Sequence, residues 1–308
     1  MRFNEGADLD TSDITDIRGS GGGGFGGRGI AVGGGGLGLV GLVIVVLLNV
    51  FGSGSGTGGG SGVGGFGGIG QGQSADNAQL QQECQKGTDA NQSEECAVVA
   101  EINSIQNFWE QTLGSRYTRT DTVFFSGQVQ TQCGAASSGS GPFYCPADQL
   151  VYIDLTFFDD LRTQFGAQGG LFVDAYVLAH EYGHHVQNLL GINQQVQSGV
   201  TGPESGSVRL ELQADCFAGV WANHATTVPD ETSGQPLITE INQDDVDRAL
   251  DAASRIGDDF IQRNLGGGRV DQNSFTHGTS AQRERWFTTG YQSGDVNRCD
   301  TFATDDLG

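Results

Sequence analysis

Hydrophobic and polar positions alternate with a helical period in most of the chain beyond residue 77. Between residues 93 and 114, apolar side chains recur three and four positions apart, and Ser93 and Gly114 stand where a helix would begin and end. The same spacing and end signals predict further helices at residues 172–190, 205–226, 242–264 and 280–292. In these segments, Asn242 is a predicted N-cap and Gly191 a predicted stop.

Two short segments have the composition of strands. Residues 122–127 and 150–155 are rich in valine, phenylalanine, tyrosine and isoleucine, which favour strands. The segment between them contains several glycines and Pro142, and is predicted to be a loop. Because helices outnumber strands, and the strands precede the helix at 172–190, the order predicts an α+β fold in which a small sheet lies beside a helical core.

The N-terminal part of the chain has a different pattern. Residues 30–51 contain no charged side chain and are apolar on all sides. As a helix they would be about 33 Å long, the thickness of a bilayer core. Arginines precede this segment and the next basic residue is Lys86, so the positive-inside rule places residues 1–29 in the cytoplasm. A cleaved signal peptide is the competing interpretation, disfavoured by the acidic start and the missing A-x-A site.

This pattern predicts a single-pass protein of the cell membrane. Residues 52–76 are rich in glycine and serine and form the expected linker, and residues 77–308 form the expected extracytoplasmic domain. The formal net charge of the chain is −22. This charge excludes nucleic acid as an expected partner, because nucleic-acid binding needs a basic surface.

All cysteines follow the apolar segment, as expected for disulfides in an oxidising compartment. Sequence spacing favours two local pairs and one long-range pair, although other connectivities remain open. The candidates are Cys84 with Cys96, Cys133 with Cys145, and Cys216 with Cys299. No C-x2-C spacing supports a zinc site built from these cysteines.

Residues 180–185 read His-Glu-Tyr-Gly-His-His within the helix predicted at 172–190. His180 and His184 are four positions apart, so they project from one helical face and can bind the same Zn²⁺ ion. Glu181 lies between them and can act as general base toward a zinc-bound water. His185 lies off this face and is interpreted as a packing residue. The pattern predicts a zinc peptidase with one zinc ion.

A catalytic zinc ion usually has a third protein ligand. The best candidate is Glu211, in the helix predicted at 205–226, and Asp215 one turn later could accept the free N–H of a ligand histidine. His224 and His277 are rival third ligands. An ordinary solvated acidic face remains the alternative for the Glu211 helix.

His277 has a second possible role. It precedes the helix predicted at 280–292, and it could donate a hydrogen bond to the oxyanion of a tetrahedral intermediate. Arg283 is predicted to orient the loop that carries His277. The alternative is a loop histidine without a catalytic role.

Several motifs together resemble a bacterial family of membrane-anchored neutral zinc metallopeptidases. Besides the H-E-x-x-H helix, the similar segments are residues 13–19, 87–91, 133–138, 141–148, 211–216 and 276–283. The resemblance implies a zincin-like, mainly helical domain. A more remote similarity to membrane-linked gluzincin peptidases implies Glu211 as third ligand and His277 as transition-state donor, although Gly278 stands where those peptidases usually carry proline.

We therefore expect an extracytoplasmic zinc metallopeptidase that cleaves a peptide or protein substrate and is anchored by one membrane span. The strand at 150–155 is expected to align an extended substrate by edge pairing. The alternatives are a non-catalytic zinc-containing module that binds envelope proteins, a structural domain held by disulfides, and an amidase acting on cell-wall peptides.

Overall fold

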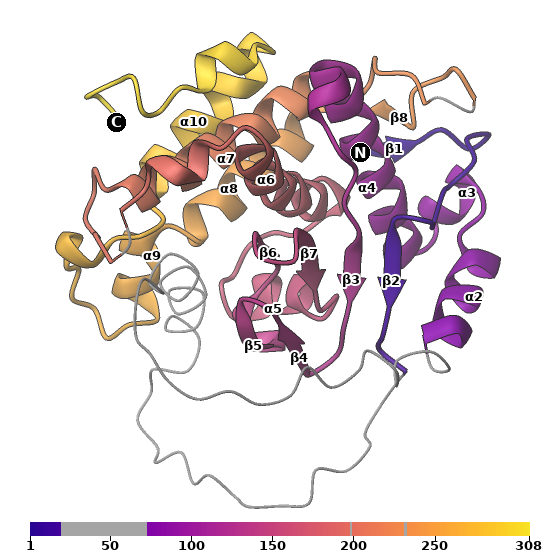
Figure 1. Cartoon of the computed structure of the whole chain (residues 1–308), viewed down its shortest axis with the longest axis horizontal. Coiled ribbons are helices and arrows are strands. Elements are labelled where there is room, and N and C mark those ends of the chain that lie inside the picture. Colours follow the sequence, from indigo (N-terminus) through magenta and orange to yellow (C-terminus); the bar gives the residue numbers. More distant parts are fainter. Residues whose placement is uncertain (20–72, 198, 231–232) are drawn as a thin grey trace, which may run out of the picture.

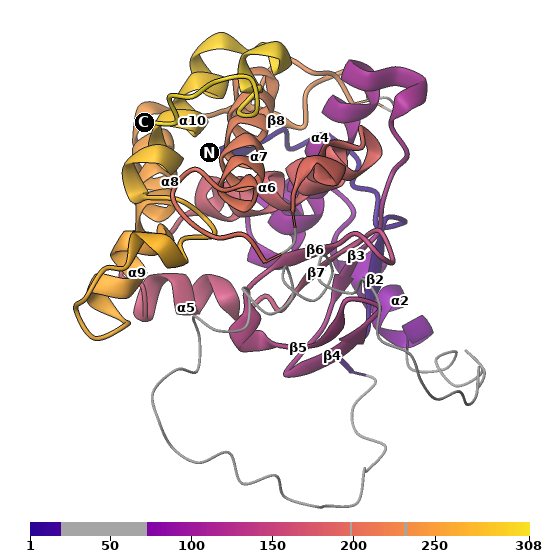
Figure 2. The same ribbon diagram turned by 60° about the vertical axis from the view of Figure 1, so that its left-hand side comes forward.

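The computed structural model describes residues 1–19, 73–197, 199–230 and 233–308. Figure 1 shows helices above a small sheet, with two short helices beside the strand at the right-hand edge. Figure 2 shows the same layers from another side, with the β4–β5 hairpin (Gln128–Thr131 and Gly134–Ser137) at the bottom of the domain. The predicted α+β class and the small sheet beside a helical core agree with this architecture.

The main sheet has four strands in the order β2-β3-β7-β6. Strands β2 (Ile14–Asp16), β3 (Thr122–Phe124) and β7 (Leu150–Ile153) are parallel, and β6 (Phe143–Cys145) runs antiparallel to β7. Because β7 lies between β3 and β6, the prediction that residues 150–155 offer a free edge to a substrate is wrong. The edge strand on that side is β6, which lies in the segment predicted to be a loop.

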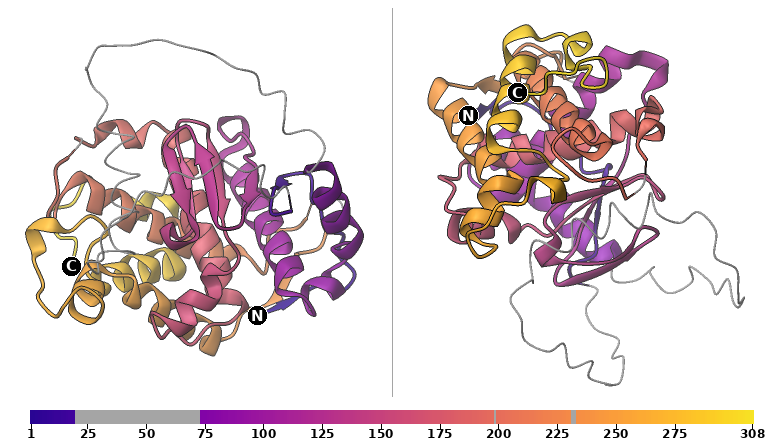
Figure 3. Two further views of the ribbon diagram at one scale, coloured as in Figure 1. Left: turned by 90° about the horizontal axis from the view of Figure 1, so that it is seen from below. Right: turned by 90° about the vertical axis from the view of Figure 1, so that its left-hand side faces the viewer.

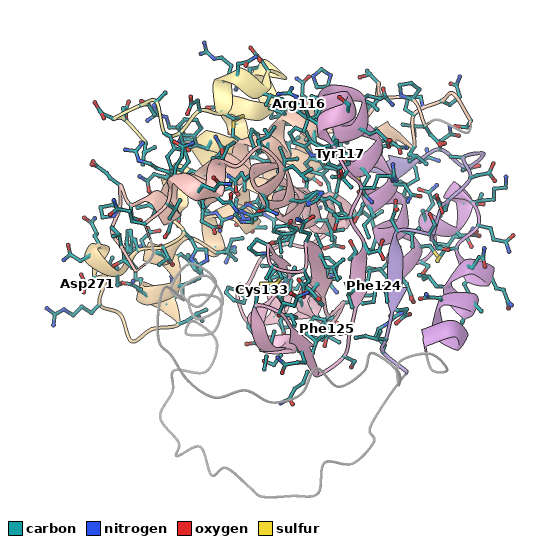
Figure 4. The ribbon with its side chains drawn as sticks, viewed as in Figure 1. Arg116, Tyr117, Phe124, Phe125, Cys133 and Asp271 are labelled. Carbon is teal, nitrogen blue, oxygen red and sulfur yellow. A yellow bond between two sulfur atoms is a disulfide. The ribbon has the colours of Figure 1, made fainter. Side chains whose placement is uncertain are left out.

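Both faces of the sheet are covered. Phe124 and Tyr144 are buried in the core shared with the helices, whereas Phe125, on the opposite face, is buried in a second cluster with Cys133 of the β4–β5 hairpin. Figure 4 labels Phe124, Phe125 and Cys133 at this sheet. The left-hand view in Figure 3, taken from below, shows the hairpin lying between the N-terminal and C-terminal parts of the domain. The hairpin therefore covers the face of the main sheet that is opposite the helices.

The predicted helices are present with shifts of one or two residues at their ends. Ser93 caps the first by accepting from the Cys96 N–H, and Asn242 caps another by accepting from the Asp245 N–H. The longer helices are α4 (Glu94–Leu113), α6 (Leu171–Leu189), α7 (Gly206–His224), α8 (Gln243–Arg255) and α10 (Ser280–Ser293). Shorter ones are α2 (Gln73–Glu83), α3 (Gly87–Ala90), α5 (Phe157–Thr163) and α9 (Asp258–Asn264).

One segment that was predicted to be a single helix forms two helices. The segment 242–264 is broken at Gly257 into α8 and α9. A Cβ atom at Gly257 would lie 2.4 Å from the Ser280 backbone nitrogen. Any residue with a side chain would clash there, so this position requires glycine. The turn that results directs α9 toward the loop of His277, through the hydrogen bond from the Asp258 N–H to the Gly278 carbonyl.

Helices α7 and α10 pack with their backbones in direct contact. A Cβ atom at Gly219 would lie 2.1 Å from the Phe287 carbonyl oxygen, and one at Gly290 would lie 2.0 Å from the Cys216 carbonyl oxygen. This close approach is possible only because both positions lack a side chain. It fixes α10, which carries Arg283, against α7, which carries Glu211 and Asp215.

The structure contains the favoured disulfide pairs, Cys84–Cys96, Cys133–Cys145 and Cys216–Cys299. The first joins the end of α2 to the start of α4, the second joins the hairpin to β6, and the third joins α7 to the C-terminal segment. The pairing predicted from sequence spacing is confirmed.

The N-terminal segment corrects the predicted organisation. Strand β1 (Arg2–Phe3) pairs with β8 (Ile238–Glu240), and β2 pairs with β3 inside the main sheet. Direct pairing requires residues 1–19 and the domain to lie on the same side of any membrane, which contradicts a preceding membrane span with residues 1–29 on the other side. The sequence pattern missed this because two very short strands carry almost no periodic signal.

Within the part of the chain that the structure describes, no helix is both long and apolar enough to cross a bilayer. The segment 30–51, predicted as a membrane helix, and most of the predicted linker at 52–76 lie outside the described residues.

Packing of the N-terminal segment makes a testable prediction. Phe3 is buried with 2% of its surface exposed, so Phe3→Ala should lower the free energy of unfolding by about 3 kcal/mol. The neighbouring Arg2 side chain is 65% exposed, so Arg2→Ala is the matched control and should change stability by less than about 0.5 kcal/mol. Urea unfolding of the full chain measures both, and equal effects would show that this segment is a detached tail.

Candidate metal centre

Three side chains from two helices converge on one point. His180 and His184 project from the same face of α6, and their Nε2 atoms are 3.2 Å apart. Glu211 of α7 completes the group, with Oε2 3.2 Å from the His180 Nε2 and Oε1 3.5 Å from the His184 Nε2. His180 and Glu211 are buried, whereas the His184 side chain keeps 16% of its surface exposed.

The spacing of these donor atoms fits a single zinc ion. Tetrahedral zinc binds histidine nitrogen at about 2.0–2.1 Å, which places neighbouring donor atoms about 3.3–3.4 Å apart. The distances between the donors are 3.2–3.5 Å, and nitrogen and carboxylate oxygen are both ordinary zinc ligands. Glu211, predicted to join the two histidines, therefore lies beside them in the structure. All three line a cavity of about 200 Å³, which leaves room for a fourth ligand.

Each histidine is held by a hydrogen bond at its other ring nitrogen. The His180 Nδ1 lies 2.8 Å from Asp215 Oδ1, and the His184 Nδ1 lies 2.9 Å from Gln187 Oε1. Since both partners are acceptors, each Nδ1 carries the proton and each Nε2 presents its lone pair to the centre. Asp215 occupies the predicted place. Gln187 was missed, although its position three residues after His184 is a usable helical signal.

Asp215 is itself fixed by two further side chains. Its carboxylate accepts from the Arg283 guanidinium at 2.9 Å on both oxygens, and from the Tyr176 hydroxyl at 2.7 Å. Burial alone would raise the pKa of Asp215, but Arg283 and His180 hold it at about 2. The carboxylate therefore stays ionised. Arg283 thus lies beside Asp215, outside the three converging donors, as predicted, but it holds Asp215 and does not orient the loop of His277 as expected.

We expect Asp215→Asn to weaken zinc binding by about 10–100-fold, the usual cost of losing a hydrogen-bond partner of a ligand histidine. The amide could present its NH₂ group toward His180 and would leave the buried Arg283 without its counter-charge. Competition with a chelator measures the affinity. Asp244→Asn is the matched control, since the Asp244 side chain is 69% exposed and pairs with Arg248 on α8. Equal zinc affinity of the two variants would exclude a role for Asp215.

Glu181 is buried and lines the same cavity as the three converging residues. Its Oε2 accepts a hydrogen bond from the backbone N–H of Tyr144 on β6, at 2.9 Å. Burial raises the pKa of this carboxyl group. A carboxylate one residue from His180, facing the same cavity, has the position that a general base beside a metal ion would require.

Residues 1–302 match the protein family described as "Putative neutral zinc metallopeptidase". The chain belongs to this family. The uncharacterized protein Rv2575 of Mycobacterium tuberculosis is 52% identical over 226 residues, which cover 73% of this chain and 76% of that protein. The uncharacterized protein YpfJ of Escherichia coli is 44% identical over 231 residues, covering 72% of this chain and 76% of that protein. No solved structure matches the chain.

Membership in a zinc metallopeptidase family implies a zinc cofactor, and the donor set of His180, His184 and Glu211 is suited to it. A second group in the described residues, Cys133, Cys145 and Asp148, is not suited, because both sulfurs are joined in a disulfide and cannot act as thiolate ligands.

His277 also lines the cavity, but it is not among the three converging donors. Its Nδ1 lies 3.0 Å from Thr276 Oγ1 and 3.3 Å from Asp258 Oδ1. The other Asp258 oxygen accepts from the backbone N–H groups of Thr276, His277 and Gly278. Asp258 therefore shapes this loop, a role that sequence reasoning assigned to Arg283.

The other two histidines lie apart from the converging donors. The His224 Nε2 lies 2.9 Å from the Gly294 carbonyl oxygen, at the far end of α7, so the rival proposal of His224 as third ligand fails. His185 is buried and bonded through both nitrogens, to the Tyr144 hydroxyl at 3.0 Å and the Thr118 carbonyl at 2.7 Å. This agrees with the interpretation of His185 as a packing residue and links it to strand β6.

Proposed function

We propose that this chain is a peptidase that hydrolyses peptide bonds with one zinc ion held by His180, His184 and Glu211. Zinc bound there would supply a Lewis acid that lowers the pKa of water and polarises a peptide carbonyl. The observation that carries the proposal is the convergence of these three donors on one point, beside the carboxylate of Glu181 and inside one cavity.

Glu181 is the proposed general base and acid. Its carboxylate would take a proton from the attacking water and later deliver it to the leaving amine. Burial in the cavity wall supports this role, because a carboxyl group with a raised pKa holds the transferred proton more readily. The backbone N–H of Tyr144 occupies one carboxylate oxygen, which leaves the other for proton transfer.

His277 is the proposed hydrogen-bond donor to the oxyanion that develops on the peptide carbonyl. Support comes from its place in the wall of the same cavity and from the three backbone hydrogen bonds that hold its loop to Asp258. Asp258 and Thr276 both lie within hydrogen-bond distance of Nδ1, so Nε2 remains as the ring nitrogen for a substrate.

Loss of this donor in His277→Ala should lower kcat by about 10²–10³-fold with zinc still bound, measured on any cleaved peptide.

The cavity walls indicate which substrate the site would accept. Besides the polar groups named above, apolar side chains form much of the lining, among them Phe157, Phe165, Val177, Leu210 and Ile256. Such walls favour peptides with apolar side chains next to the cleaved bond.

A peptide library incubated with the zinc-loaded and the chelator-treated full chain tests the proposal. Cleavage by the zinc-loaded protein, its loss after chelation and its return with added zinc would support a zinc peptidase. Cleavage confined to cell-wall peptide fragments in a parallel incubation would assign an amidase instead. Zinc bound without any hydrolysis would favour a non-catalytic module.

We also propose that the protein works in an oxidising compartment outside the cytoplasm. The three disulfides support this, because disulfides of this kind form and persist there. Thiol labelling of the protein in its native cells, followed by mass spectrometry, would find all six cysteines protected from the label. Free thiols would contradict the proposal.

A further inference from the structure

Strand β6 presents one backbone N–H group toward the metal centre. Tyr144 is paired with Val151 across the two antiparallel strands, and the Val151 N–H donates to the Asp121 carbonyl on the other side of β7. Tyr144 and Val151 are therefore a non-hydrogen-bonded pair, and the Tyr144 N–H points away from the sheet. It donates to Glu181 Oε2 at 2.9 Å.

The side chain of the same tyrosine attaches β6 to the metal-binding helix. Its hydroxyl lies 3.0 Å from the His185 Nδ1 and 3.0 Å from the Asn188 Nδ2. The His185 Nε2 lies 2.7 Å from the Thr118 carbonyl oxygen, so this nitrogen carries the proton and Nδ1 is an acceptor. The Tyr144 hydroxyl thus donates to His185 and accepts from the Asn188 amide, and both of its roles are satisfied.

The next residue adds a covalent restraint. Cys145 is bonded to Cys133 of the β4–β5 hairpin, and both sulfurs belong to the buried cluster on the opposite face of the sheet. Strand β6 is held by this disulfide on one face and by the Tyr144 hydroxyl on the other. The backbone N–H between them consequently has little freedom to move relative to α6.

We propose that Tyr144 is a positioning residue for Glu181. This inference rests on the proposed function of Glu181 as general base. The N–H bond to a carboxylate oxygen is charge-assisted, and it fixes Oε2 so that Oε1 alone is presented for proton transfer. The hydroxyl contacts with His185 and Asn188 act through the backbone, by holding the strand at the distance at which this bond forms.

Amide hydrogen exchange on the zinc-loaded full chain tests the bond itself. The residue 144 amide has no partner in the sheet, so without Glu181 it should exchange rapidly. In the wild type we expect it to be protected, and in Glu181→Ala we expect exchange at least about tenfold faster, while the Phe143 and Cys145 amides keep their rates. Rapid exchange of this amide in the wild type would overturn the proposal.

Kinetics of Tyr144→Phe test the positioning role. We expect kcat to fall by about tenfold, because small displacements of a catalytic group are costly, with KM and zinc affinity unchanged. Tyr152→Phe is the matched control: it also removes a strand tyrosine hydroxyl, which donates to Asp148 at 2.9 Å, and should keep the wild-type kcat. Equal kcat for wild type and Tyr144→Phe, or an equal loss in both variants, would overturn the role.

The two measurements separate this inference from the proposed function. If the wild type cleaves no peptide, the proposed function fails, and with it the catalytic role of Tyr144. The exchange rates would then still decide whether the Tyr144 N–H is bonded to Glu181. If the wild type cleaves peptides and the residue 144 amide is unprotected, the positioning role alone fails.

Discussion

Replacing Glu181 by glutamine is expected to lower kcat for peptide hydrolysis by at least about 10²–10⁴-fold, the range measured for loss of a general acid–base group. Glutamine has the shape of glutamate, and its amide oxygen can still accept from the Tyr144 N–H. It cannot take a proton from water at neutral pH. The fold and the three converging donors should therefore be unchanged, and zinc should remain bound at the wild-type stoichiometry.

The decisive comparison is between activity and metal content in the same preparation. Elemental analysis reports the zinc content, and initial rates on a cleaved peptide report kcat. Asp159→Asn is a suitable control, because it removes a carboxylate whose side chain is 72% exposed and should leave both values unchanged. A Glu181→Gln protein that retains wild-type kcat with its zinc would remove the general-base role. Loss of both zinc and activity would show instead that Glu181 supports the metal centre.

Replacing Glu211 by alanine is expected to abolish stable zinc binding. The substitution leaves only two imidazoles at a site that needs three protein ligands, and it removes the one negative charge among the donors. In the wild type, free zinc at about a thousand times the dissociation constant should stabilise the fold by about 4 kcal/mol. In Glu211→Ala, this zinc-dependent gain in the free energy of unfolding should be lost.

His224→Ala provides the matched control for this experiment. His224 lies on the same helix and was the rival ligand, but it bonds to the Gly294 carbonyl and stacks on Phe108. Its variant should keep full zinc stoichiometry and the zinc-dependent rise in thermal unfolding midpoint. Undiminished zinc binding by Glu211→Ala would contradict the proposed ligand set, and loss of zinc in the His224 variant would reopen the choice of third ligand.

Local spacing explains why so much of the site could be predicted. His180, Glu181 and His184 lie on one helix, as do Glu211 and Asp215, so a period of 3.6 residues is enough to place each set on one face. That the two helices meet was inferred from the three ligands that a catalytic zinc ion requires and from the resemblance to gluzincin peptidases. The structure brings the two sets together, and Gln187, which was not predicted, links them by bonding to His184 and to the Leu210 carbonyl of α7.

The parts that sequence reasoning missed depend on contacts between distant segments. Strand β6 has only three residues and follows a glycine-rich stretch, so its pattern is no clearer than that of a loop. Which strand lies at the edge is decided by pairing across the sheet, and this pairing reverses the expected roles of β6 and residues 150–155. Tyr144 could therefore not be recognised as a partner of Glu181.

The N-terminal segment depends even more on partners that are distant in the sequence. Residues 1–19 read as a polar tail, because β1 and β2 together have five residues and their partners follow more than a hundred positions later. Arg18, counted as a cytoplasmic charge, is paired in the structure with Asp16 and Glu95. The positive-inside prediction treated the arginines of residues 1–29 as unpaired charges, and for Arg18 this is wrong.

A crystal structure of the zinc-loaded full chain, with anomalous diffraction data collected above and below the zinc absorption edge, tests the central claim most directly. We predict one peak per chain, about 2.0–2.1 Å from the Nε2 atoms of His180 and His184 and about 2.0–2.2 Å from an oxygen of Glu211. A peak at another place, or a Glu211 carboxylate turned away from both imidazoles, would contradict it.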